Sequence, residues 1–213
     1  MTQRRPDVES YYRLHARFYD ATRWAFLFGR SELLREIGDR LTPQRVLEVG
    51  CGTGTNLLRL GELYPKASLT GVDLSPDMLG KAERKLSPWS DRVQLLRGKF
   101  PEVLKKPEEP EEEEPFDLVL FSYSLSMMNP GWKEAIAAAK SRLRPGGCLA
   151  VVDFHDSPSA TFQAWMELNH VRLGGHLLEE LLRNAGKSTY RVSKAFLGLW
   201  RFFTYCSSHS IAC

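Results

Sequence analysis

Cysteine is scarce in this sequence, and the few cysteines lie far apart. The four are Cys51, Cys148, Cys206 and Cys213, and none has the paired spacing of a metal site. Such sparse thiols fit a reducing, intracellular environment better than a disulfide framework. We therefore assign the cysteines no chemistry of their own and expect no metal site.

Long apolar runs are also absent. A helix that crosses a bilayer needs about 20 predominantly apolar residues, and the apolar stretches of this chain are far shorter. The N-terminal residues MTQRRPDVES continue into charged and aromatic sequence, without the apolar core of a secretory signal. We expect a cytoplasmic protein with no transmembrane helix.

The net charge is small but unevenly distributed. The formal charge is +3, from 29 basic and 26 acidic residues. Six of the acidic residues are the glutamates at 108, 109 and 111–114, so the rest of the chain carries nine more basic than acidic residues. A basic body can attract an anionic membrane or nucleic acid, although scattered basic residues on a solvated surface are the commoner explanation.

The chain length suits one α/β domain. Strand-like and helix-like patterns alternate, which indicates βαβ units and a parallel sheet. The expected strands are Arg45–Val49, Ser68–Val72, Val93–Leu96, Leu118–Ser122 and Cys148–Phe154, followed by a hairpin of Tyr190–Ala195 and Leu199–Ser207. Apolar residues at three- or four-residue intervals predict helices over Asn56–Leu63, Pro76–Lys85, Lys133–Leu143 and Ala160–Ala185. The expectation is a seven-stranded, mostly parallel sheet with a C-terminal antiparallel hairpin and helices on both faces.

Two segments stand apart from this pattern. Residues 1–40 are expected to form an N-terminal helical lid or substrate segment, ahead of a cofactor-binding core over residues 41–213. Within the core, residues 105–115 (KKPEEPEEEEP) combine proline with like charge, which predicts a mobile surface loop. A tail that binds cations or a partner is the minority interpretation of that loop.

The most informative motif is VLEVGCGTG over Val46–Gly54, in which a buried strand runs into three glycines and then a helix. Glycine tolerates positive φ and presents no side chain, so the backbone of such a turn can approach a ligand closely. Gly50, Gly52 and Gly54 have the spacing Gly-x-Gly-x-Gly, whereas sites that cradle a dinucleotide pyrophosphate have Gly-x-Gly-x-x-Gly. The spacing therefore favours a ligand without phosphate.

Asp73 ends the second expected strand, nineteen residues beyond Gly54. A carboxylate at this position can accept hydrogen bonds from both hydroxyls of an adenosine ribose. An unmodified 2′-hydroxyl suits S-adenosylmethionine (SAM) or NAD and excludes NADP.

Four motifs occur together, in one order: Val46–Gly54, Gly71–Met78 (GVDLSPDM), Phe116–Val119 (FDLV) and Leu143–Gly147 (LRPGG). With these motifs the chain resembles the class I SAM-dependent methyltransferases. The resemblance implies a Rossmann-like, doubly wound sheet. It also implies methyl transfer from SAM, with S-adenosylhomocysteine (SAH) as the product.

The same resemblance implies a set of cofactor-binding residues. They are Glu48, Gly50, Cys51, Gly52, Gly54 and Asn56 around the methionine moiety and its loop, Asp73 at the ribose, and Leu74 and Met78 beside the adenine. The family often has an acidic or polar residue after the third strand, where this chain has Gly98, Lys99 and Phe100, so a backbone group is expected to meet the adenine amine. Phe121, Ser122 and Tyr123, at the end of the fourth strand, are expected to face the methyl group and the acceptor.

Two segments, His15–Arg30 (HARFYDATRWAFLFGR) and Phe121–Met128 (FSYSLSMM), carry a narrower resemblance. They look like the N-methyltransferases of bacterial betaine-lipid synthesis, which convert diacylglyceryl-homoserine to its trimethylated form. For that acceptor, the aromatic faces of Tyr19, Trp24 and Tyr123 would stabilise the growing quaternary ammonium.

Three further side chains are reasonable for the same substrate. Arg23 or Arg30 would pair with the homoserine carboxylate, and His155, after the fifth strand, could take the ammonium proton. Packing in a helix or lid is the competing interpretation of Trp24 and the arginines. A satisfied or solvent-facing imidazole is the competing interpretation of His155.

Other functions stay open. A quinone precursor or another small soluble acceptor would fit the same cofactor site, and a SAM-binding protein without transferase activity is a second alternative. No nucleic-acid partner is expected, because the fourth strand ends in Phe-Ser-Tyr-Ser rather than in an Asn/Asp-Pro-Pro-aromatic motif. A lipid acceptor would require peripheral contact with the inner membrane surface. The oligomeric state and the number of methyl groups transferred stay open.

Overall fold

The structure, a computed structural model, describes residues 27–104, 114–169, 171–183 and 187–208, and one sheet organises them. Its strands are β1 (Arg45–Val49), β2 (Ser68–Asp73), β3 (Val93–Arg97), β4 (Phe116–Ser122), β5 (Leu143–Asp156), β6 (Ser188–Ala195) and β7 (Trp200–Ser208). They lie in the order β3-β2-β1-β4-β5-β7-β6. The first five are parallel, and β7 runs antiparallel to both β5 and β6. The predicted fold class is therefore confirmed.

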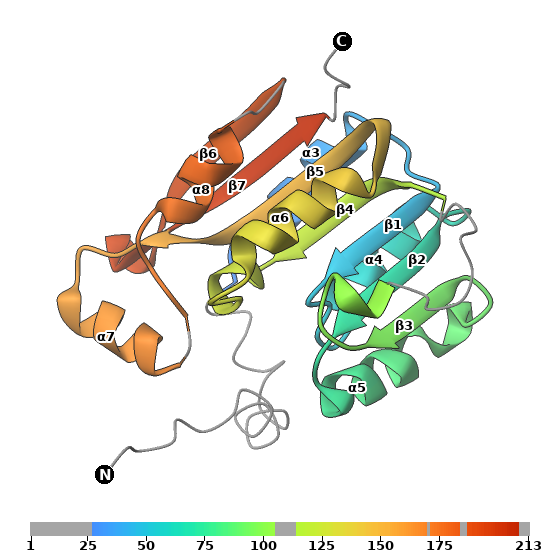
Figure 1. Cartoon of the computed structure of the whole chain (residues 1–213), viewed down its shortest axis with the longest axis horizontal. Coiled ribbons are helices and arrows are strands. Elements are labelled where there is room, and N and C mark those ends of the chain that lie inside the picture. The colour runs from blue at the N-terminus through green and yellow to red at the C-terminus, as the bar shows by residue number, and fades with distance from the viewer. Residues whose placement is uncertain (1–26, 105–113, 170, 184–186, 209–213) are drawn as a thin grey trace.

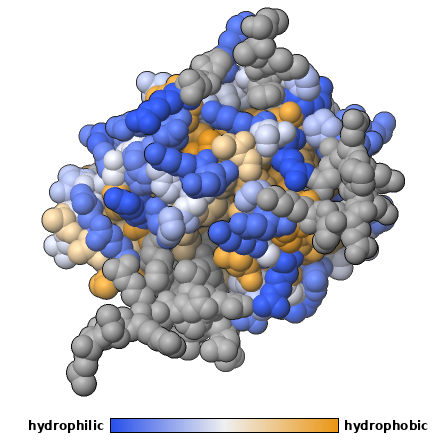
Figure 2. All heavy atoms as spheres, in the orientation of Figure 1, coloured by the Kyte–Doolittle hydropathy of each residue, from blue (hydrophilic) through white to orange (hydrophobic). Residues whose placement is uncertain are grey.

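Helices cover both faces of the sheet, because side chains alternate along each strand. The helices are α3 (Arg30–Gly38), α4 (Thr55–Leu63), α5 (Pro76–Leu86), α6 (Trp132–Ser141), α7 (Ala160–Leu168) and α8 (His176–Leu182). In β1, Val46 packs into the core beneath α3, α4 and α5, whereas Leu47 packs into the core beneath α6 and α8. Figure 1 shows α6 and α8 in front of the sheet, with α3 and α4 behind it. The outer surface on this side is largely hydrophilic, with apolar residues visible between the polar ones (Figure 2).

The segment assigned to an N-terminal lid is described only in part. Within it, α3 buries Leu33, Leu34 and Ile37 against the sheet, so residues 30–38 belong to the core layer. Residues 1–26 lie outside the described residues, and a lid over them stays a prediction. Residues 105–113 of the acidic loop also lie outside, while Glu114 pairs with Arg45 at 2.7 Å.

The prediction of one helix over residues 160–185 is wrong. The structure has two helices, α7 and α8, with Gly174 and Gly175 between them. The N–H groups of both glycines donate to the carbonyl oxygen of His155, at 3.1 and 2.8 Å, and Gly175 has φ +71°. Glycine adopts this left-handed conformation without strain, so the glycine pair turns the chain back to the end of β5.

Asp117 fixes the start of β1 from the neighbouring strand. It occupies an irregularity in the pairing of β4 with β5. Its Oδ2 accepts hydrogen bonds from the backbone N–H of Gln44 (2.6 Å) and Arg45 (2.7 Å), and its Oδ1 pairs with Arg144. This part of the Phe116–Val119 motif therefore joins β1, β4 and the beginning of β5, at the end of the sheet opposite the glycine loop.

Gly71 in β2 offers a test of packing behind the glycine loop. A Cβ there would meet Leu57 Cδ1 at 2.7 Å, Leu95 Cδ2 at 2.8 Å and Cys51 Sγ at 2.9 Å. We expect Gly71→Ala to lower the free energy of unfolding by about 1–3 kcal/mol, as overpacking does elsewhere. In the matched control, Gly80→Ala on α5, the new methyl has only Arg84 Nη1 within 4 Å, at 3.9 Å, and should add about 0.5–1 kcal/mol. Urea denaturation measures both, and equal effects would contradict this packing.

Candidate functional site

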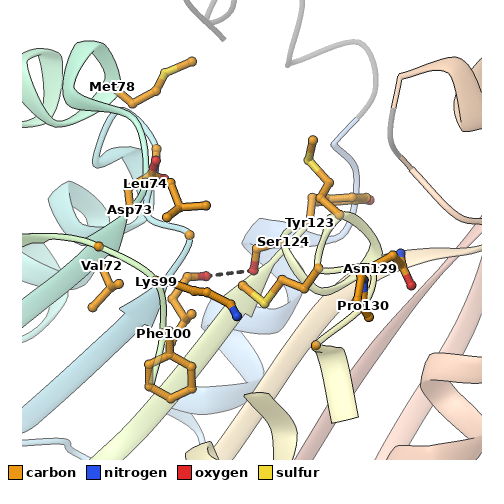
Figure 3. A pocket seen from close by; sticks show the side chains of 17 residues that line it. Val72, Asp73, Leu74, Met78, Lys99, Phe100, Tyr123, Ser124, Asn129 and Pro130 are labelled. Carbon is orange, nitrogen blue, oxygen red and sulfur yellow. Dashed lines mark hydrogen bonds between the residues drawn. The ribbon is translucent and has the colours of Figure 1, made fainter. Parts of the chain in front are cut away.

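A pocket opens at the carboxyl ends of β1, β2 and β4, where ligands bind in open α/β sheets. One wall consists of Gly50 and Gly52 from the glycine loop, with Asp73 and Leu74 at the end of β2 (Figure 3). The opposite wall consists of Tyr123, Ser124 and residues 127–131, which follow β4. The sheet order thus brings together segments more than 70 residues apart.

Asp73 holds the glycine loop in place. Its Oδ2 accepts a hydrogen bond from Gly52 N at 2.8 Å, and its Oδ1 accepts one from Ser75 N at 2.9 Å. A carboxylate oxygen has two lone pairs, so each oxygen can accept a further hydrogen bond. Asp73 is half-buried and lines the pocket, which is the arrangement that two ribose hydroxyls require.

The glycines of the loop have two different roles. Gly50 and Gly52 line the pocket with φ +74° and +54°, and a Cβ on Gly50 would lie 2.5 Å from Ser124 Cβ. Ser124 Oγ donates to the carbonyl oxygen of Val49 at 2.7 Å, which ties the segment after β4 to the end of β1 (Figure 3). Gly54 does not line the pocket, and a Cβ there would meet Leu86 Cδ1 at 2.9 Å on α5. The third glycine therefore serves helix packing.

An apolar surface lies beside Asp73. Leu74 is 51% exposed at the pocket, although it is a large aliphatic side chain, and Met78 and Phe100 also line the pocket. Gly98 and Lys99 complete this side, and Lys99 pairs with Glu102 at 3.5 Å. An adenine ring that covers Leu74 would bring its attached ribose to Asp73. These residues fit the adenosine of SAM.

Besides Gly54, four of the predicted cofactor residues lie behind the pocket rather than on its wall. Asn56 Nδ2 donates to Glu48 Oε1 at 2.7 Å, and both side chains are buried. Cys51 packs into the core beside Gly71. Phe121 is also buried in the core, where its ring meets Phe100 edge-on at 6.2 Å. Their direct contact with a cofactor stays a prediction; as placed, they support residues that line the pocket.

Tyr123 lines the pocket and is in contact with Arg30. The hydroxyl of Tyr123 donates to the carbonyl oxygen of Phe28 at 2.8 Å, and the Arg30 guanidinium carbon lies 5.8 Å from the Tyr123 ring centre. Arg30 Nε also donates to Ser122 Oγ at 3.0 Å. Burial, with a smaller contribution from Asp153, raises the pKa of Tyr123 well above its usual value. Its phenol therefore stays protonated at neutral pH and serves as a donor.

His155 lies away from the pocket lining. Its ring packs against Phe203 at 6.2 Å, beside Gly175, and forms a 3.9 Å pair with Asp156. Burial lowers the pKa of this imidazole. The structure gives no contact between His155 and the pocket residues. Tyr19, Arg23 and Trp24 lie outside the described residues.

Asp153 is a supporting residue that the sequence analysis missed. It is fully buried, and its carboxylate accepts hydrogen bonds from Ser126 N at 3.1 Å and Phe154 N at 2.8 Å. Ser126 belongs to a short helical turn, Leu125–Met127, that leads into the pocket wall of residues 127–131. Burial raises the pKa of Asp153 to about 6. Asp153 thus positions the pocket wall of residues 127–131.

Metal ligands are not gathered in the part of the chain that the structure describes: no group of three or more His, Cys, Asp or Glu side chains is arranged to hold an ion there. Within those same residues, no helix is long and apolar enough to cross a membrane.

Sequence comparison identifies the domain around the pocket. Residues 46–147 match the family model described as a methyltransferase domain. Malonyl-[acyl-carrier protein] O-methyltransferase of Priestia megaterium is 30% identical over 151 residues, which are 70% of this chain and 50% of that protein. Trans-aconitate 2-methyltransferase of Streptomyces avermitilis is 32% identical over 144 residues, 67% of this chain and 51% of that protein. The chain therefore spans about half the length of these curated relatives.

Solved structures share the fold. N-methyltransferase NodS from Bradyrhizobium japonicum WM9, in complex with SAH, aligns over 84% of this chain and 85% of that chain, with a TM-score of 0.66 and 20% identity. The fold and the pocket at the carboxyl edge define a Rossmann-like cofactor-binding domain. The family match is more specific: residues 46–147 are similar to a methyltransferase domain, and the residues that line the pocket fit SAM as a cofactor.

The ribose assignment of Asp73 can be tested by calorimetry. We expect Asp73→Asn to weaken SAH binding by about 1–3 kcal/mol, because the amide loses charge and one acceptor while Gly52 N loses its charged partner. In the control, Asp77→Asn changes an exposed carboxylate in the first turn of α5 and should leave the Kd unchanged. An unchanged Kd in Asp73→Asn, with a native circular dichroism spectrum, would remove Asp73 from the site.

Asp153 should make stability depend on pH. Its pKa is about 6 in the folded protein and 3.8 when unperturbed, so the folded state holds the proton more tightly. Stability is then lost as pH rises from about 4 to about 6, and the shift corresponds to about 3 kcal/mol. Asp153→Asn does not titrate. The difference in unfolding free energy, variant minus wild type, should therefore rise by about this amount across the window, and parallel curves would contradict the buried carboxyl.

Proposed function

We propose that this chain methylates the amine of a diacylglyceryl-homoserine lipid in successive transfers that end at the trimethylated betaine. Bound SAM supplies a methyl group on a sulfonium, which a neutral amine can attack in line. The residues of this chain have to hold the cofactor at β1 and β2 and orient the amine beside Tyr123.

One observation carries the proposal. The described end of the His15–Arg30 segment lies against the Phe121–Met128 segment, through the hydrogen bond from Tyr123 to Phe28 and the hydrogen bond from Arg30 to Ser122. These are the two segments that resemble betaine-lipid N-methyltransferases. Their meeting beside the pocket supports a shared acceptor site.

The side chains at this meeting point suit an amino acid headgroup. Arg30 places a guanidinium beside Tyr123, which lines the pocket, and a second edge of its planar fork could pair with a carboxylate. Tyr123 lines the pocket, so its aromatic ring could attract a cation bound there. An aromatic face attracts an ammonium without a bond to the nitrogen, so it does not block the next transfer. In this proposal the amine proton leaves to solvent.

The comparisons support amine and carboxylate acceptors in different relatives. NodS is named as an N-methyltransferase, whereas the Priestia and Streptomyces relatives are named for malonyl-[acyl-carrier protein] and trans-aconitate. A small carboxylate or a quinone precursor is therefore the competing acceptor. A non-catalytic SAM-binding role is the other alternative, and it predicts no turnover of any acceptor.

The acceptor assignment is tested with purified protein, SAM and detergent-dispersed diacylglyceryl-homoserine, with products followed by mass spectrometry. We expect mono-, di- and trimethylated lipid in sequence. Trans-aconitate and a demethylated quinone precursor are offered in parallel reactions. Turnover of either of these with no methylated lipid would refute the lipid assignment.

Arg30 provides a sharper test of headgroup recognition. We expect Arg30→Lys to raise the KM for the lipid about tenfold or more, because a point charge cannot keep both the Ser122 contact and a bidentate pair with a carboxylate. The KM for SAM should stay constant. Arg35→Lys, on the exposed face of the same helix, is the matched control. Equal KM values in the two variants would exclude Arg30 from headgroup binding.

A further inference from the structure

An exposed apolar edge lies outside the methyl-transfer site. We use this name for Trp165 and Leu168 of α7 together with Phe196, Leu197 and Leu199, which form the turn between β6 and β7. Leu197 is fully exposed, Leu168 is 80% exposed, and the other three are each exposed by two fifths or more. Large apolar side chains are rarely gathered at a solvated surface without a partner.

Two members of the apolar edge, Trp165 and Phe196, pack on one aromatic support. Phe162 stacks on Trp200 with ring centres 5.2 Å apart, and it also meets Trp165 at 5.8 Å. Phe196 packs against the same Trp200 at 4.7 Å. Figure 1 shows α7 and the turn between β6 and β7 at the same end of the molecule. Trp165 of α7 and Phe196 of the turn are therefore connected through the stacked rings of Phe162 and Trp200.

The backbone of the turn is unusual for its sequence. Phe196 and Leu197 both have positive φ, of 43° and 55°, a conformation that favours glycine and asparagine at hairpin turns. The left-handed region is energetically costly for an L-residue. Because Leu197 is fully exposed, no packing in the described structure offsets that cost. Folding alone does not explain a leucine at this position.

The charges near the apolar edge balance one another. Lys194 is exposed next to the turn, with its Cδ 3.8 Å from the position of a Cβ on Gly198. Arg201 at the other end of the turn is balanced by its ion pair with Asp156. On α7 the one charged residue is Glu167. A projecting apolar tip with an exposed tryptophan and a lysine has the composition of an interfacial membrane anchor.

The apolar edge also lies on the functional side of the sheet. Arg201 pairs with Asp156 at the carboxyl end of β5, and the pocket lies at the carboxyl ends of β1, β2 and β4. Since β5 is parallel to these strands, the turn and the pocket are at one edge of the sheet. A bilayer that touches the turn would face the side on which an acceptor enters.

We propose that the apolar edge docks this chain on the surface of a lipid bilayer, with Leu197 and Leu168 inserted among the headgroups. The proposal deepens the proposed function, since it supplies the route by which a lipid acceptor would be reached. It does not depend on which lipid is methylated.

Vesicle binding tests the docking surface without any acceptor. The full chain is sedimented with phosphatidylglycerol-phosphatidylcholine vesicles that contain no homoserine lipid. Leu197→Asn combined with Leu168→Gln should reduce the partition coefficient about tenfold or more, because two leucines no longer leave water. Asparagine suits positive φ, so the fold should be retained, and the thermal midpoint checks this. Leu63→Gln, at an exposed leucine of α4, is the matched control and should bind as wild type does.

The outcomes separate docking from catalysis. Wild-type partition in the double variant would overturn the docking surface. So would a wild-type dimer in sedimentation that the double variant dissociates, since the partner would then be a second copy of the chain. With detergent-dispersed lipid, the double variant should methylate at the wild-type rate, whereas with vesicle-embedded lipid it should be slower. Absence of lipid methylation by the wild type under both conditions would refute the proposed function while vesicle partition still decides the docking surface.

Discussion

Two backbone N–H groups, those of Gly52 and Ser75, converge on the carboxylate of Asp73, and the geometry of the site depends on this convergence. A glycine loop loses more conformational freedom on folding than any other segment of its length. Charge-assisted hydrogen bonds are strong enough to offset part of that loss. Ser75 is also the N-cap of α5, where its Oγ accepts from Met78 N at 3.3 Å. One carboxylate therefore sets both the open loop and the start of the helix that brings Met78 to the pocket.

The opposite wall of the pocket, which follows β4, is also held by hydrogen bonds between side chains and backbone. Ser124 joins the segment after β4 to the carbonyl of Val49, and Asp153 from β5 holds Ser126. In each case a polar side chain of one strand end binds the backbone of its neighbour. The spacing between the two walls then follows from the spacing of β1, β2 and β4 in the sheet, so the width of the pocket is a property of the fold rather than of its loops.

The cofactor side of the site was predictable because its parts are contiguous in the chain. Val46–Gly54 is a strand, a turn and a helix start in succession, and the expected strand Arg45–Val49 is β1 itself. Asp73 follows from its position at the end of the next strand. Alternation along β4 could not show that Phe121 faces the core, because Leu120 and Ser122 on its other side are buried as well.

The acceptor side was less predictable because it depends on contacts between distant segments. Residues 127–131 have no helical or strand period, and they reach the pocket because Asp153, more than 20 residues later, holds the preceding turn. The break between α7 and α8 likewise depends on the carbonyl of His155, which accepts from the glycine pair. A prediction from sequence periodicity cannot include a hydrogen-bond acceptor that another strand contributes.

The placement of β7 between β5 and β6 constrains the order in which the sheet can assemble. In the described sheet β6 pairs with β7 alone, so it cannot join until the strand that follows it in the chain is present. The two strands are neighbours in sequence and can pair as a local hairpin at little loop-closure cost, whereas the pairing of β7 with β5 spans a much longer loop. The hairpin is then free to form first and to add to the sheet as a finished unit. In this order of assembly, the turn of residues 196–199 would form together with the hairpin, before β7 pairs with β5.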